Sequence, residues 1–129
     1  MTKSLLMIHG VGCGGEVWHR MQPGFEAAGW TCSTPTLFPE QRVRENPPAS
    51  LSDLGLDDYV KSMADTARLM ADETGAKPAV IGHSMGGLIA QCLVEQGLVS
   101  QAVFLTPAQP KDCSAVTLPV AYTFLNILI

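Results

Sequence analysis

The stretch AVIGHSMGG (residues 79–87) places Ser84 two residues after Gly82 and two residues before Gly86. The apolar residues before the serine predict a buried strand, and residues 85–96 predict an amphipathic helix. A sharp strand-to-helix turn lifts a side chain clear of a sheet, and it needs small residues where the two backbone segments meet. The pattern therefore predicts Ser84 as an exposed nucleophile. The alternative is a serine that only caps the helix after a tight turn.

The rest of the chain alternates between short apolar runs and helical patterns. Helices are predicted over 16–28 and 57–74, with Asp57 as the N-cap of the second. Pro23 would kink the first helix or delay its start. Strands that alternate with helices predict an α/β fold, a three-layer sandwich with a parallel sheet of about four strands and helices on both faces. The expected strands are 4–8, 31–34, 78–82 and 101–105, and the proline-containing residues 36–56 are expected to form a long loop that could hold one helical turn.

A second glycine-rich turn, HGVGCGG (residues 9–15), follows the first expected strand. The chemistry of a parallel sheet gathers at the carboxyl ends of its strands, so this turn and Ser84 are expected at one edge. Acyl transfer passes through an oxyanion that needs backbone N–H donors already in place. We expect these donors to be the amides of Met85 and Val11, with Gly12 as the substitute for Val11. The alternative, a phosphate-binding turn, would need a GxGxxG or P-loop spacing that these residues lack.

The sequence offers no obvious general base for the serine. The three histidines are His9, His19 and His83, and none of them follows Ser84. His83 adjoins the serine and should point away from it in a tight turn. We expect His9 to shape the first turn and His19 to lie on the surface.

The carboxylates are equally sparse after the serine. Glu95 lies on the expected helix after the turn and should face solvent, which leaves Asp112 as the candidate acid. The earlier carboxylates share one helical face and are expected to form its solvated side, namely Asp57, Asp58, Asp65 and Asp72.

Composition narrows the class of protein. The chain has 129 residues, enough for one domain, and its formal net charge of −4 gives no reason to expect nucleic acid or an anionic membrane as a partner. No apolar run reaches the roughly 18 residues of a membrane span, and no targeting signal is visible. The four cysteines lack zinc spacing and suggest reduced thiols in a cytoplasmic protein. No metal or organic cofactor is implied.

Several stretches resemble the α/β-hydrolase fold family: HGVGCGG, Trp18, GHSMGG and LTPAQP (residues 105–110). The resemblance covers about residues 4–112. It implies that Ser84 lies beside the turn that His9 begins, and that an acid and then a histidine follow the serine along the chain. It also implies that the expected strands lie side by side in the order 31–34, 4–8, 78–82 and 101–105. The residues to which it gives supporting roles are His9, Gly10, Gly12, Gly82, His83, Gly86 and Gly87.

On this interpretation residues 1–112 are the amino-terminal part of a hydrolase core, and the apolar residues 113–129 begin a cap that is cut short. The expected reaction is hydrolysis of a small-molecule carboxylic ester, or a related acyl compound, through an acyl-enzyme. The chain by itself is expected to be a fragment with little or no activity, because it lacks the histidine of the triad. Three alternatives stay open: a lyase or cofactor-free haloperoxidase on the same scaffold, an inactive protein that binds a small ligand, and a protein that self-associates through its apolar tail (115–129).

Overall fold

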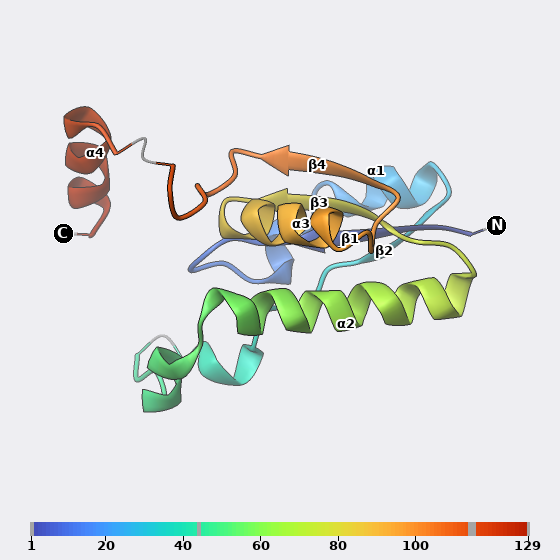
Figure 1. Cartoon of the computed structure of the whole chain (residues 1–129), viewed down its shortest axis with the longest axis horizontal. Coiled ribbons are helices and arrows are strands. Elements are labelled where there is room, and N and C mark those ends of the chain that lie inside the picture. The colour runs from blue at the N-terminus through green and yellow to red at the C-terminus, as the bar shows by residue number, and fades with distance from the viewer. Residues whose placement is uncertain (1, 44, 114–115, 129) are drawn as a thin grey trace.

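Four parallel strands form a single sheet in the computed structural model, which describes residues 2–43, 45–113 and 116–128. The spatial order is β2-β1-β3-β4, and Figure 1 shows the strands side by side. Every neighbouring pair is parallel, so the predicted sheet and its strand order are confirmed. The strands are β1 (Lys3–Ile8), β2 (Trp30–Ser33), β3 (Ala79–His83) and β4 (Gln101–Leu105).

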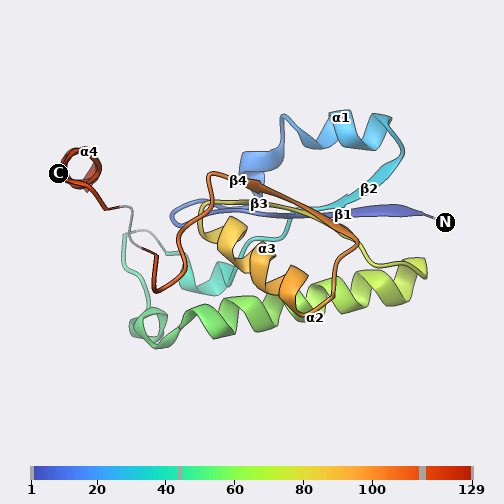
Figure 2. The same ribbon diagram turned by 45° about the horizontal axis from the view of Figure 1, so that its top comes forward.

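Helices cover both faces of this sheet. In Figure 2, α1 (Gln22–Ala27) lies on one side, whereas α2 (Leu56–Thr74) and α3 (Met85–Glu95) lie on the other. The side chains of β1 alternate between the two layers, as the period of a strand requires. Leu5 and Met7 pack in the cluster of Trp18, Ala79 and Ile81, whereas Leu6 and Ile8 pack against the two long helices. The predicted three-layer architecture is therefore confirmed.

The single helix predicted over 16–28 is wrong. The structure has a 3-10 helix, η1 (Gly15–Trp18), and then the short α1. Pro23 lies in the first turn of α1, where its missing N–H costs nothing, so the helix starts late. Trp18 is buried in the core, whereas Met21 is 40% exposed.

The N-cap predicted at Asp57 is also wrong. Helix α2 begins at Leu56, and Gly55 is its N-cap. The carboxylate of Asp58 accepts the N–H of Gly55 at 2.8 Å and so occupies one of the free donors at the helix start. The predicted solvated side of this helix is confirmed, since all four of its aspartates are exposed: Asp57, Asp58, Asp65 and Asp72.

The segment between β2 and α2 folds back over the carboxyl edge of the sheet. It holds two short 3-10 helices, η2 (Pro39–Gln41) and η3 (Ala49–Asp53). Leu37 is 1% exposed and belongs to the core below α2 and α3. The segment predicted as a long loop that could hold one helical turn is therefore anchored to the body of the protein at its start.

The last described element is α4 (Leu118–Leu128), which stands apart from the sheet and its helices in both ribbon views (Figures 1 and 2). Its first residues are exposed, including Leu118 at 89%. The assignment of 113–129 to a cap stays a prediction, and residues 114, 115 and 129 fall outside the described part of the chain. No helix in the described ranges is long and apolar enough to cross a membrane.

Candidate active site

Ser84 occupies a strained backbone conformation between β3 and α3, with φ 54° and ψ −119°. Such a conformation costs about 1–3 kcal/mol in a residue with a side chain, and it persists only where the surroundings enforce it. Here four hydrogen bonds enforce it. The Ser84 N–H donates to the Leu105 carbonyl at 3.1 Å, and the Ser84 carbonyl accepts the amides of Gly87 (2.9 Å), Leu88 (3.2 Å) and Ala108 (2.8 Å).

The glycines around Ser84 allow backbone segments to approach so closely that a Cβ would not fit between them. A Cβ on Gly82 would overlap the backbone of Gly86, and a Cβ on Gly86 would overlap the carbonyl of Ile8 at the end of β1. A Cβ on Gly87 would come within 2.8 Å of the Pro107 ring, in the segment after β4. The start of α3 is thus packed against β1, β3 and the chain that leaves β4.

The turn after β1 lies directly against the serine. A Cβ on Gly10 would be 3.0 Å from the Ser84 Cβ. Beyond it, Gly12 has a φ of 72° and Val11 is 73% exposed. Within the described ranges no group accepts a hydrogen bond from the amides of Val11 or Met85. The structure therefore places two unpaired N–H donors on the two turns that flank the serine.

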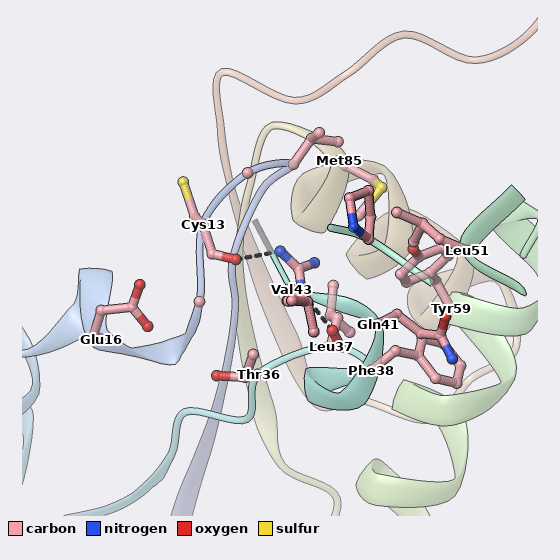
Figure 3. Close-up of a pocket in the computed structure, with 15 residues that line it drawn as sticks. Cys13, Glu16, Thr36, Leu37, Phe38, Gln41, Val43, Leu51, Tyr59 and Met85 are labelled. Carbon is pink, nitrogen blue, oxygen red and sulfur yellow. Dashed lines mark hydrogen bonds between the residues drawn. The ribbon is translucent and has the colours of Figure 1, made fainter. Parts of the chain in front are cut away.

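A cavity of about 640 Å³ opens beside these two donors (Figure 3). Val11 and Met85 both line it, and Ser84 directly precedes Met85. Its other walls come from the turn after β1, from Tyr59 of α2 and from residues of the 36–51 segment, including Leu37, Phe38, Gln41, Arg42, Val43 and Leu51. Sequence reasoning missed this wall. The one signal that could have indicated it is the position of the segment, directly after a strand at the sheet edge where parallel sheets carry their sites.

His9 ties this wall to the turn. It is fully buried, its Nε2 accepts the N–H of Leu37 at 2.9 Å, and its Nδ1 lies 2.8 Å from the Gly10 carbonyl. Because Nε2 accepts, the proton of the neutral ring sits on Nδ1. Burial lowers the His9 pKa below its ordinary value of 6.5, against the opposing effect of the Gly10 carbonyl, and the charge of Arg42 lowers it further. His9 is therefore a neutral residue that holds two segments together.

The sequence matches the alpha/beta hydrolase family over residues 5–127. The chain belongs to this family. Among curated proteins it is 28% identical over 111 residues to a probable esterase, PIR7A, of Oryza sativa subsp. indica, covering 84% of this chain and 40% of that protein.

Solved structures of this hydrolase family share the fold. A mutant of polyneuridine aldehyde esterase matches with a TM-score of 0.63 and 22% identity, over 98% of this chain and 48% of that one. An extracellular alpha/beta-hydrolase from a Paenibacillus species matches with a TM-score of 0.66 and 19% identity, over 96% of this chain and 50% of that one. Identities this low show the fold alone. The chain spans about half the length of the relatives it matches.

In the described part of this alpha/beta hydrolase chain, no base and no acid are assembled around the serine. In the described residues the Ser84 hydroxyl has no hydrogen-bond partner. His19 is exposed, and His83 is half-buried with its Nδ1 towards Gly10. The candidate acid Asp112 is exposed, and so is Glu95, as expected for its face of the helix. No cluster of metal-ligating side chains occurs in the ranges that the structure describes.

Proposed function

We propose that this chain carries the nucleophile and the oxyanion site of a serine hydrolase that acts on carboxylic esters. The observation that carries the proposal is the strained conformation of Ser84, held by four backbone hydrogen bonds next to two unpaired amides. A serine that only capped a helix would need no such strain. The name of the rice relative, a probable esterase, supports an ester as the substrate.

In the proposed reaction the Ser84 oxygen attacks the ester carbonyl while a histidine takes the hydroxyl proton. The carbonyl oxygen becomes an oxyanion that accepts the N–H groups of Met85 and Val11. Collapse of the tetrahedral intermediate expels the alcohol, which receives the proton from the histidine, and leaves an acyl group on Ser84. Water then releases the acid by the same steps. Each well-placed oxyanion donor contributes about 10²–10³ in rate.

None of the three histidines of this chain suits the role of base. His9 is buried with its Nε2 already bonded to Leu37, and His19 and His83 make no hydrogen bond to Ser84. We propose that the histidine comes from the half of the family fold that this chain does not span. The 129-residue chain should then show little turnover, although an oxyanion site alone can retain about 10³–10⁴ over the reaction in water.

The test treats the 129-residue chain with a fluorophosphonate and maps the labelled serines by mass spectrometry. We expect Ser84 to be labelled at least about tenfold faster than the exposed Ser50 and Ser52, because only Ser84 has oxyanion donors beside it. Labelling of all three serines at one rate would remove Ser84 as the nucleophile.

A second measurement on the same chain follows release of nitrophenol from a p-nitrophenyl ester. We expect a rate close to that of the Ser84→Ala variant after any first turnover. Rapid, sustained turnover that Ser84→Ala abolishes would keep Ser84 as the nucleophile and would contradict the proposal that the base lies outside this chain.

A further inference from the structure

Arg42 lies in the wall of the cavity with its guanidinium fixed by two backbone carbonyls. Its Nε donates to the Leu37 carbonyl at 2.6 Å, and its Nη1 donates to the Cys13 carbonyl, the dashed line that ends on Cys13 in Figure 3. The bond to Leu37 is local, whereas the bond to Cys13 joins residues 29 apart in sequence, so the side chain spans from the wall segment to the turn after β1. The guanidinium is therefore held in one orientation, and its Nη2 makes no bond to any described residue.

Among the residues that the structure describes, no carboxylate pairs with the positive charge of Arg42. The ion pairs in the described ranges join Asp65 to Lys61 and to Arg68, on the exposed side of α2. Glu16 is the single acid among the residues that line the cavity, and in Figure 3 it lies on the opposite side of Cys13 from Leu37. Burial makes an unpaired charge costly, so a half-buried guanidinium gains most from an anion that enters the cavity.

The charge of Arg42 lies in the cavity where the proposed reaction would take place. Arg42 lines the same cavity as Val11 and Met85, whose amides are the proposed oxyanion donors. Most of the wall that it shares with them is apolar, including Leu37, Phe38, Val43 and Leu51. A ligand with its ester carbonyl at the two amides and an apolar chain along this wall would bring its other end to the guanidinium.

We propose that Arg42 binds a carboxylate of the substrate, so that the substrates are monoesters of dicarboxylic acids with a short apolar chain between the two groups. This inference rests on the proposed ester hydrolysis at Ser84. Since Nε and Nη1 already donate to backbone carbonyls, the donors of Nη2 and the positive charge of the guanidinium are what a carboxylate would meet. Arg42 acts here as a binding residue for the free carboxylate, whereas the ester carbonyl lies at the amides of Val11 and Met85.

The test compares monomethyl glutarate with dimethyl glutarate, which differ only in the free carboxylate. Titration of each into the isotopically labelled 129-residue chain is followed by amide chemical shifts. We expect the monoester to bind at least about tenfold more tightly and to shift the amides of Val11, Gly12 and Met85. Equal affinity for the two esters, or binding of neither, would overturn the inference without any need for a variant.

Variants assign the effect to one side chain. Arg42→Gln should lose the preference for the monoester, and Arg42→Lys should keep part of it because the charge remains. Arg20→Gln, which removes an exposed arginine away from the cavity, should bind like the wild type. A preference unchanged in Arg42→Gln would also overturn the inference. The fluorophosphonate labelling of Ser84 does not depend on Arg42, so failure of that labelling would identify failure of the proposed function instead.

Discussion

The two glycine-rich turns at the carboxyl edge of the sheet use glycine for different reasons. In the turn between β3 and α3, the glycines have ordinary backbone angles and the strained residue is Ser84. Gly82 and Gly86 are needed there because neighbouring backbone leaves no room for a Cβ. In the turn after β1, Gly12 takes the positive φ itself, and a Cβ on it would meet nothing within 4 Å.

The difference separates the turn at Ser84, where backbone leaves no room for added atoms, from the turn after β1, where there is room. We call the second the adaptable turn. The turn at Ser84 is locked by contacts with β1, β3 and the segment after β4, as the role proposed for Ser84 requires. The turn after β1 is fixed at its two ends, by Gly10 against Ser84 and by Gly15 against the Thr34 carbonyl. Between them Val11 and Gly12 are exposed, and a Cβ on Gly12 would meet nothing within 4 Å, so this part has room for added atoms.

The largest effect should come from adding one methyl group to the locked turn. Gly86→Ala would drive a Cβ into the Ile8 and His9 carbonyls, and backbone in the central strand cannot yield as a side chain does. We expect a loss of at least about 3 kcal/mol in the free energy of unfolding, measured by urea denaturation. The matched control is Gly24→Ala in α1, where the added Cβ would meet no atom within 4 Å. Its free energy of unfolding should rise by about 0.5–1 kcal/mol. A Gly86→Ala chain as stable as the control would show that this turn is not locked.

Acidification should weaken the connection between the turn after β1 and the cavity wall. His9 is neutral in the folded chain and its pKa is below 6.5, so the unfolded chain binds a proton first as the pH falls. This contribution to stability is complete above pH 6.5 and is lost as the pH falls below 6.5 towards the folded-state pKa, with a slope of at most about 1.4 kcal/mol per pH unit. Urea denaturation between about pH 7.5 and about pH 5.5 measures it.

Two histidine variants test whether His9 causes this pH dependence of stability. His9→Gln should be less stable at neutral pH but should lack the slope, because the amide cannot take up a proton. His19→Gln, at an exposed position, should keep the slope of the wild type. The same slope in all three chains would show that another group is responsible.

Features that depend on neighbouring residues could be predicted from the sequence, whereas features that depend on contacts between distant residues could not. The four strands, their order and the turn at Ser84 could be predicted, because apolar runs and glycine spacing are local signals and the family resemblance supplied the order. The split of the helix over 16–28 could be predicted only in part. Pro23 indicated a late start, but the burial of Trp18 depends on the sheet beneath it.

The cavity wall could not be predicted from local patterns. Leu37 is placed by a hydrogen bond to His9, 28 residues earlier, and Arg42 by a bond to Cys13, 29 residues earlier. Neither contact leaves a periodic signature, because each is one side chain that reaches one backbone group. Residues 36–56 therefore looked like an unconstrained loop, although they supply much of the surface that a substrate would meet.

A smaller effect is expected from Gly12→Ala in the adaptable turn. The space is open, so the methyl group meets no neighbour, but the φ of 72° is unfavourable for alanine. We expect a loss of about 1–2 kcal/mol in the free energy of unfolding, less than that of Gly86→Ala. Gly14→Ala is a useful companion, since the three atoms nearest to its Cβ would all belong to the movable side chain of Glu16. If Gly12→Ala were as damaging as Gly86→Ala, the distinction between the two turns would fail.

The smallest effect, and the one of opposite sign, is expected at the serine itself. Ser84→Gly releases a backbone strain of about 1–3 kcal/mol and gives up about 0.5–1 kcal/mol to the greater freedom of glycine in the unfolded chain. The net result should be a gain of about 1 kcal/mol in the free energy of unfolding, together with loss of fluorophosphonate labelling. Ser100→Gly, just before β4 and without positive φ, should instead lose about 0.5–1 kcal/mol. A gain at Ser84 beside a loss at Ser100 would show that stability is given up at the position of the proposed nucleophile. A loss at both would mean that the Ser84 conformation carries no strain, and the main support for its role as nucleophile would be gone.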